Sequence, residues 1–188
     1  MTPARPPVRT SRPPRLLPAA PLLSLALLLA PAPAEAFELS TGVSVGGILA
    51  GATPRFALSP NVGLSLRTEA GFLFAAHDVL SILVPINGAG AGFDNRLSAA
   101  VGYATENSAF SIGPSLSVYL MPVCSPLVCG QVLGLSPGAQ AQAEVYLAGP
   151  LGVAVTASAG WMGGRSYSLS GGVAAMVIAG PVLRWTSK

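Results

Sequence analysis

The stretch FSIGPSLSVYL, residues 110–120, decides the fold. Its even-numbered positions are apolar residues and one proline, whereas its odd-numbered positions are serine, glycine and tyrosine. Strand side chains alternate between two faces, so this segment predicts a strand with one apolar face and one small, polar, uncharged face. On a helix the same apolar residues would be scattered around the whole circumference.

The same alternation recurs along most of the chain and predicts about eight strands. The expected strands are residues 37–49, 62–74, 79–86, 96–103, 110–120, 133–147, 151–161 and 167–185. Residues 55–61 contain Pro60 and are either a turn or an outward extension of the second strand. Short connections are expected after Ala75, Tyr103 and Leu147, and longer ones at residues 85–95 and 122–131.

The first 36 residues differ in composition from the rest. Four arginines come first, followed by the apolar run 22–30 and by Ala34-Glu35-Ala36. This order is typical of a secretory signal peptide, with cleavage before Phe37. The alternative of an amino-terminal anchor is disfavoured because the run is shorter than the about 20 residues that span a bilayer. We therefore expect residues 37–188 to form one exported domain.

Charge is scarce, and its distribution excludes one class of partner. Charged residues make up 9% of the chain, compared with about 25% in soluble proteins. The net charge of +3 comes from the expected signal peptide, because six basic and six acidic residues balance in the rest. The basic excess therefore indicates no nucleic-acid partner.

The scarcity of charge also predicts which face meets the surroundings. A soluble barrel with an apolar lumen, such as a lipocalin, would turn the serine and glycine face to water. Roughly 25–35% of the residues on a soluble surface are charged, whereas the serine and glycine face has very few charged residues. Small neutral groups suit a narrow lumen, and the leucines and valines then face lipid. The alternative is a secreted, soluble lipocalin-like barrel that binds an apolar ligand.

Aromatic residues on the apolar face gather at both ends of the expected strands. Those beside short turns or chain ends are Phe37, Phe72, Phe74, Tyr103, Phe110 and Trp185. Those beside the longer connections are Phe93, Trp161 and Tyr167. Two such rows are typical of the aromatic belts at membrane interfaces, so they independently favour a wall that faces lipid.

Alternation, aromatic rows and short turns opposite longer loops resemble the small eight-stranded outer-membrane β-barrels of the OmpA/OmpX type, over residues 37–185. The resemblance implies an all-β, up-and-down antiparallel barrel in the outer membrane of a Gram-negative bacterium, inserted by the barrel-assembly machinery. It implies no specific role and no oligomeric state. Such barrels usually end on an aromatic residue that the machinery recognises, whereas here Trp185 is followed by three more residues.

Four charged residues fall on the polar face and would lie inside the barrel. They are Arg67, Glu69, Arg96 and Glu144. Buried charges need partners, so ion pairs across the lumen are expected. An eight-stranded barrel has room for little beyond side chains, so we expect a lumen that is mostly filled. The alternative is a narrow, porin-like pore gated by these charges.

The sequence contains no pattern typical of catalysis or of cofactor binding. A lipid-modifying hydrolase needs an activated serine with a histidine base, but the single histidine, His77, is expected in a turn beside Asp78 and near Ser81. Residues 88–92 lack the Lys-Ser/Thr ending of a phosphate-binding loop, and no spacing of ligands indicates a metal site. We expect a structural or surface-exposed protein without a cofactor, with a lipid-modifying enzyme as a further alternative.

The two cysteines, Cys124 and Cys129, flank Ser-Pro-Leu-Val. In an exported protein such a close pair is expected to form a disulfide. With no histidine or carboxylate nearby, the two thiols would make a poor metal site.

Overall fold

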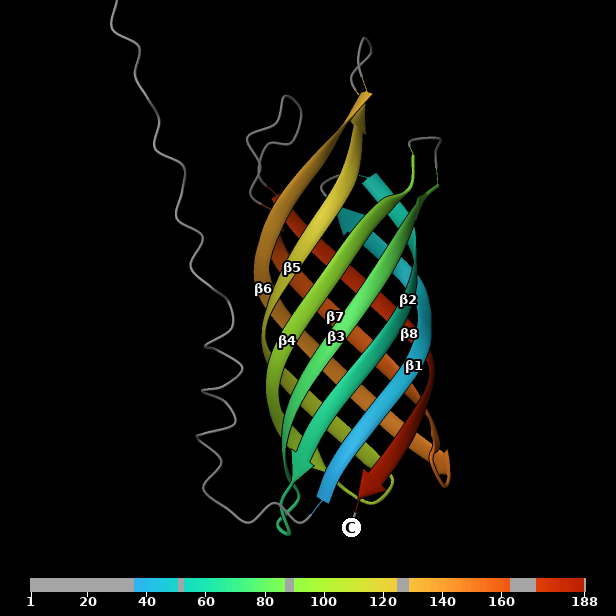
Figure 1. The fold of residues 1–188 in the computed structure, drawn as a ribbon, viewed down its shortest axis with the longest axis vertical. Helices are drawn as coiled ribbons and strands as arrows, with labels where there is room; N and C mark the ends of the chain where they lie inside the picture. Colours follow the sequence, from blue (N-terminus) through green and yellow to red (C-terminus); the bar gives the residue numbers. More distant parts are fainter. Residues whose placement is uncertain (1–35, 51–52, 87–89, 125–128, 163–171, 188) are drawn as a thin grey trace, which may run out of the picture. The chain divides into compact units, whose positions relative to one another are not determined.

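The computed structural model describes residues 36–50, 53–86, 90–124, 129–162 and 172–187. Its eight antiparallel strands close into one barrel (Figure 1). The strands are β1 (Ala36–Ala50), β2 (Thr53–Arg67), β3 (Phe72–Pro85), β4 (Gly92–Ala104), β5 (Ser108–Cys124), β6 (Cys129–Ala148), β7 (Leu151–Met162) and β8 (Gly172–Ser187). Consecutive strands pair, and β1 also pairs with β8 to complete the ring. The predicted up-and-down antiparallel barrel is confirmed.

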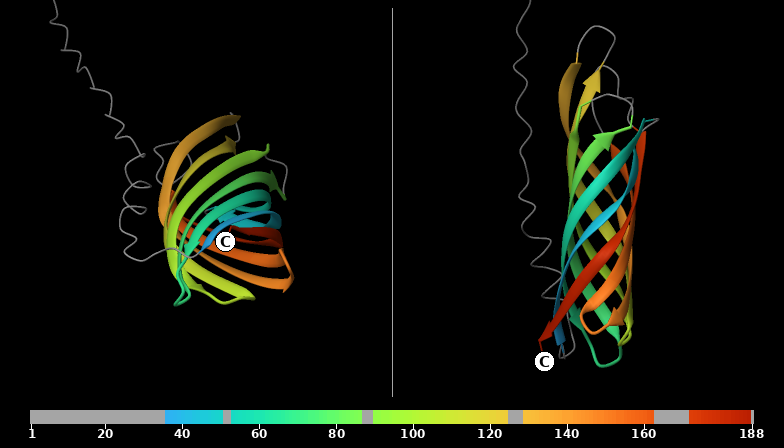
Figure 2. Two further views of the ribbon diagram at one scale, coloured as in Figure 1. Left: turned by 60° about the horizontal axis from the view of Figure 1, so that its bottom comes forward. Right: turned by 90° about the vertical axis from the view of Figure 1, so that its right-hand side faces the viewer.

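The two ends of the barrel differ (Figure 2). At one end, called here the turn end, residues 68–71, 105–107 and 149–150 connect β2 to β3, β4 to β5 and β6 to β7. The first and last described strands also meet there, because Phe37 pairs with Ser187. At the opposite end, the loop end, β5 and β6 extend beyond β7.

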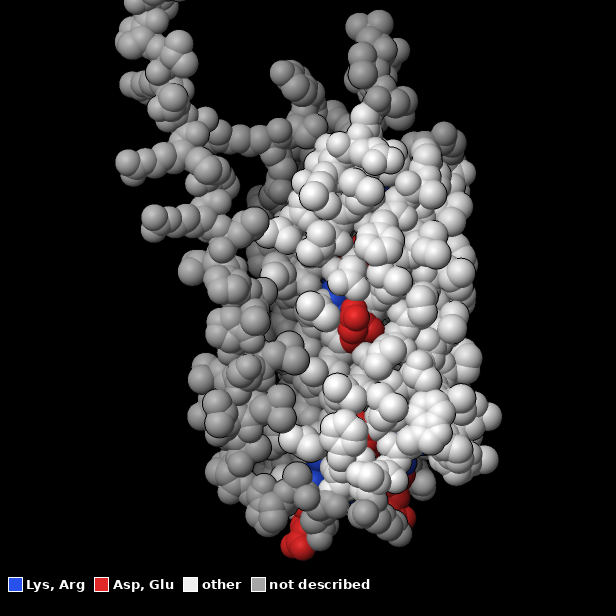
Figure 3. All heavy atoms as spheres, viewed as in Figure 1, with Lys and Arg blue, Asp and Glu red and all other residues white. Residues whose placement is uncertain are grey.

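Bulky apolar side chains face outwards, and small or polar side chains face inwards. Along β7 exposed and buried residues alternate without exception. Val153 and Val155 are on the exposed face, whereas Thr156 and Ser158 are buried. The face of the barrel drawn in Figure 3 carries few charged atoms. A barrel that holds an apolar ligand in its lumen would show the opposite arrangement.

The first turn lies closer to the amino terminus than the sequence predicted. We expected the second strand to reach Phe74, with a turn at residues 75–78, but residues 68–71 form the turn. Gly71 has a φ of +84°, a left-handed conformation that glycine adopts without strain. Even-numbered residues face outwards on both sides of this turn, so alternation alone could not locate it. His77 therefore lies within β3 and not in a turn.

Residues 55–61 are part of β2 and not a turn, so they extend the second strand outward. Pro60 is exposed on the outer wall, and the pairing of β2 with β3 is interrupted beside it. Pro181 likewise coincides with an interruption between β1 and β8. Proline has no N–H group to donate, so it is tolerated where the ladder of hydrogen bonds is broken.

The interior changes character along the barrel. Toward the loop end ten buried apolar side chains form one cluster, which we call the apolar plug, and polar side chains such as Ser81 and Arg96 are buried beside it. The members of the apolar plug are Ile48, Ala57, Val79, Leu83, Tyr119, Met121, Met162, Ala174, Met176 and Ile178. Toward the turn end most inward-facing side chains are polar, and these residues form the candidate site.

Candidate functional site

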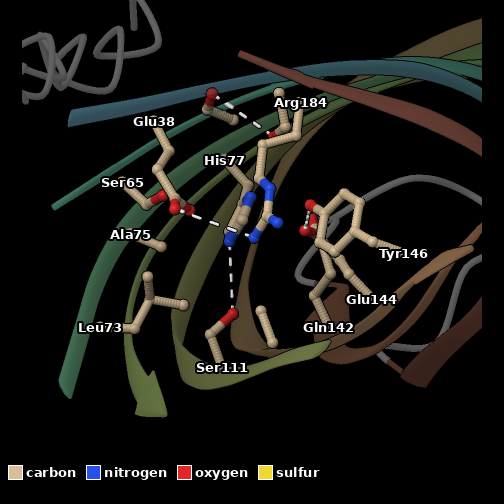
Figure 4. A pocket seen from close by; sticks show the side chains of 13 residues that line it. Glu38, Ser65, Leu73, Ala75, His77, Ser111, Gln142, Glu144, Tyr146 and Arg184 are labelled. Atoms are coloured by element: carbon tan, nitrogen blue, oxygen red, sulfur yellow. Dashed lines mark hydrogen bonds and ion pairs between the residues drawn. The ribbon is translucent and has the colours of Figure 1, made fainter. Parts of the chain in front are cut away.

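Polar side chains toward the turn end surround a small internal cavity (Figure 4). The main members of this polar cluster are Glu38, His77, Ser111, Gln142, Glu144, Tyr146 and Arg184. They come from β1, β3, β5, β6 and β8, because each strand turns every second residue into the lumen. The cavity has a volume of about 20 Å³, which is close to the space that one water molecule needs.

Closure of the barrel brings Glu38 on the first strand near Arg184 on the last. Arg184 Nη1 lies 3.8 Å from Glu38 Oε1, and the guanidinium carbon lies 3.7 Å from the centre of the Tyr146 ring. Arg184 Nη2 also donates a hydrogen bond to the carbonyl of Glu106 at 2.9 Å. The sequence did not predict this arrangement. The signal that could have found it is the need of an up-and-down barrel to pair its first and last strands.

Glu144 is held by neutral donors. Gln142 Nε2 donates to Glu144 Oε1 at 2.6 Å, and the Tyr146 hydroxyl donates to Glu144 Oε2. Thr156 Oγ1 in turn donates to Gln142 Oε1 at 3.3 Å. Residues 142, 144 and 146 share one face of β6, so the strand itself supplies two of these contacts. No ion pair of Glu144 is found in the part of the chain that the structure describes.

The other charged residues expected in the lumen do not meet each other. Arg96 is buried and forms an ion pair with Asp94, with 3.5 Å between Nη2 and Oδ2. Arg67 donates to the carbonyl of Thr105 at 3.1 Å, and Glu69 is exposed in the first turn. The Arg96 pair joins neighbours along β4 and not opposite walls, because residues two apart on a strand share a face.

His77 faces the lumen beside Ser111. Its Nε2 lies 3.3 Å from Ser111 Oγ. Ser81, the serine near His77 in the sequence, instead shares a hydrogen bond with Ser59 at 2.8 Å and donates one to Met176 Sδ at 3.7 Å. Asp78 points the other way, onto the outer wall. A serine beside a histidine is one element of a hydrolase site, but the adjoining cavity has space for about one water molecule.

Gly63 makes room for His77. A Cβ at Gly63 would lie 2.8 Å from His77 Nδ1 and 2.5 Å from Ser40 Oγ. We expect Gly63→Ala to displace the imidazole and to lower the free energy of unfolding by about 1–3 kcal/mol, as overpacking does. Gly47→Ala is the control, because a Cβ there meets nothing closer than 3.6 Å. Urea unfolding in micelles measures both, and equal effects would show that the site is not tightly packed.

Aromatic side chains of the outer wall lie toward both ends of the barrel. At the turn end the exposed ones are Phe37, Phe72, Tyr103, Phe110 and Trp185, and Phe74 is half-buried. Phe72 and Tyr103 contact each other edge to face, with ring centroids 6.4 Å apart. Toward the loop end Phe93, Trp161 and Phe56 are exposed. Phe56 was not predicted, because the sequence leaves two interpretations open for residues 55–61. Tyr167 lies outside the described residues.

Strand pairing gives the separation of the two aromatic rows. Phe72 pairs with Tyr103, and ten residues further along β3 Ile82 pairs with Phe93. With about 3.3 Å per residue and a strand tilt of about 40°, the rows lie about 25 Å apart along the barrel axis.

Other expectations concern metal ions, helices and the cysteines. Among the described residues no three His, Cys, Asp or Glu are placed to hold a metal ion. The same residues include no helix long and apolar enough to cross a membrane. Backbone pairing sets Cys124 opposite Cys129, at a spacing compatible with a disulfide. The side chains of both cysteines are outside the described part of the structure, so the disulfide stays a prediction.

Comparison with known proteins gives structural neighbours only. No family model and no curated protein matches this chain. Neisserial surface protein A is 12% identical, with a TM-score of 0.54, over 80% of this chain and 99% of its own. The N-terminal β-barrel domain of Pseudomonas aeruginosa OprF is 8% identical, with a TM-score of 0.53, over 80% and 97%.

A third neighbour is Ail, the attachment invasion locus protein of Yersinia pestis, solved in complex with the heparin analogue sucrose octasulfate. It is 8% identical, with a TM-score of 0.54, over 80% of this chain and 98% of its own. At these identities the likeness concerns the fold. This chain therefore has the fold of the small eight-stranded β-barrels of the bacterial outer membrane.

Proposed function

We propose that this chain is an exported protein of the bacterial outer membrane with a structural or surface-exposed role. The observation that carries the proposal is the apolar outer wall between two aromatic rows about 25 Å apart, the height of the apolar band of outer-membrane barrels. Residues 1–36 would be the signal peptide, and the barrel-assembly machinery would insert the mature chain.

Membrane fractionation and gel mobility test this proposal. The protein is expected in the outer-membrane fraction, resistant to carbonate and soluble only in detergent. An unheated sample should migrate differently from a boiled one, because a closed barrel binds less detergent than the unfolded chain. Sequencing of the mature amino terminus should begin at Phe37. A protein that carbonate releases and that stays soluble without detergent would disprove the membrane location.

We propose further that the lumen is mostly filled and conducts no bulk solute. Support comes from the apolar plug, whose three methionines are Met121, Met162 and Met176. In planar bilayers we expect no steady conductance from the wild type, and conductance steps when all three are replaced by Ala. Replacing Val153 and Val155 of the outer wall by Ala is the control, which should stay closed. Steady conductance of the wild type would refute a filled lumen.

We propose that the protein has no lipid-modifying activity. Support comes from the position of His77 and Ser111, which face a cavity of about 20 Å³ inside the lumen and not the outer wall. Phospholipids incubated with the purified protein should therefore stay unchanged. Turnover by the wild type that disappears in His77→Ala would instead identify an enzyme.

We propose that Cys124 and Cys129 form a disulfide. Support comes from the direct pairing of these two residues at the tip of β5 and β6. Protein purified without reductant should resist alkylation, and reduction should expose two thiols, as intact-mass measurement would show. Alkylation before reduction would show that the cysteines are free.

A further inference from the structure

One carboxylate interrupts the apolar outer wall. Asp78 is exposed on the outward face of β3. The other charged side chains of the described strands point toward the lumen. Figure 3 shows a group of acidic atoms in the middle of the face that it draws, over β3, with a few basic atoms beside it.

Asp78 lies between the two aromatic rows. Along β3 it is six residues from Phe72, and its partner on β4, Leu97, is four residues from Phe93. With about 3.3 Å per residue and a tilt of about 40°, it lies about 15 Å from the row at the turn end and about 10 Å from the other. In a membrane of matching thickness this position is surrounded by hydrocarbon and not by water or headgroups.

The neighbouring strand supplies one hydrogen-bond donor. Asn95 Nδ2 donates to Asp78 Oδ1 at 2.8 Å. A carboxylate accepts about four hydrogen bonds and a side-chain amide donates two. Among the described residues, Asp78 Oδ2 and the second N–H of Asn95 make no further bond. Hydrocarbon contains no water that could form the missing hydrogen bonds. Polar side chains at this depth therefore usually face other protein.

We propose that the wall around Asp78 and Asn95 is the contact surface of a symmetric dimer of this chain. The pair offers one free acceptor and one free donor side by side. A two-fold axis therefore lets each Asn95 donate to the Asp78 of the other copy, and both groups are satisfied reciprocally. Ala76 and Ala99 pair with each other next to the Asp78–Leu97 pair on the same face, and their small side chains allow the two walls to approach closely there. The inference rests on the proposed membrane location.

Cysteine cross-linking tests the surface, in a background of Cys124→Ser and Cys129→Ser. Ala99→Cys places a thiol on the proposed surface, and Ala157→Cys places one on the outer face of β7. Only residues close to a two-fold axis lie near their own copies, and Ala99 is close to the proposed axis between Asp78 and Asn95. Oxidation of outer-membrane vesicles should therefore cross-link only the Ala99→Cys protein, into a dimer. Cross-linking of neither or of both variants equally would overturn the proposal. A product with a different protein would assign the surface to another partner and also overturn it.

Removal of the polar pair tests the mechanism. Asp78→Leu combined with Asn95→Leu should weaken dimerisation by about tenfold or more, since hydrogen bonds between membrane segments contribute about 1–2 kcal/mol. Val155→Leu, on the far wall, is the control that should leave the dimer unchanged. Mobility of unheated protein reports separately whether each variant folds and inserts. A double variant that inserts and still dimerises would refute the role of Asp78 and Asn95 in the dimer. Failure of the wild type to insert would refute the membrane location itself.

Discussion

Arginine in place of Val155 is expected to lower the free energy of unfolding by about 2–4 kcal/mol, whereas arginine in place of Leu151 should lower it by about 1 kcal/mol or less. The two side chains have similar exposure, 44% and 47%, but differ in depth. Val155 lies in the middle of β7, whereas Leu151 directly follows the turn 149–150. A charge in hydrocarbon loses its hydration, whereas a charge near the interface keeps most of it.

Reversible urea unfolding in lipid vesicles, followed by tryptophan fluorescence, measures this difference. Val155→Leu and Leu151→Val control for the loss of each native side chain. The dependence on depth is the informative quantity, because an outer wall in water would tolerate arginine equally well at both positions. Equal and small effects would therefore show that this wall does not face lipid.

Removing Asp94 is expected to produce the second large loss of stability. Asp94 and Arg96 are 1% and 2% exposed, and their ion pair lies beside Tyr119 and Val79 of the apolar plug. Asp94→Ala would leave the Arg96 guanidinium buried without a counter-charge. Loss of one partner of a buried pair lowers the free energy of unfolding by about 3–5 kcal/mol.

The control is the double replacement Asp94→Leu with Arg96→Met. A buried ion pair exchanged for apolar residues of similar volume is often neutral or stabilising. Within the described part of the chain, Arg96 Nε and Nη1 have no hydrogen-bond partner, so we expect the double variant to be about as stable as the wild type. Urea unfolding of Asp94→Leu, of Arg96→Met and of the double variant completes the cycle. A double variant as unstable as Asp94→Ala would show that packing and not charge explains the loss.

Local periodicity was enough to predict the fold. In residues 110–120 it assigned Ser111 and Ser117 to the lumen and Ile112 to the wall, as the structure has them. That assignment needs only the two-residue repeat of a strand and the shortage of charge, both of which can be read without knowing any neighbour. The same repeat continued through the turn at residues 68–71, so it misplaced His77.

The contacts between polar groups inside the barrel could not be predicted in the same way. Whether Arg96 meets Asp94 or Glu144 depends on side-chain reach and on the register of several strands. His77 and Ser111 are 34 residues apart in the sequence. Their proximity therefore requires the correct boundary of β3 and the relative positions of β3 and β5.

The sequence by itself determined that this chain forms a barrel with small polar groups inside and aliphatic groups outside, because alternation and charge content are properties of each strand alone. Only the tertiary structure decided which polar groups meet in the lumen and that Asp78 stands on the wall beside Asn95. Those contacts depend on where each turn falls and how each strand is registered against the next. A shift of one residue in that register would exchange the two faces of a strand.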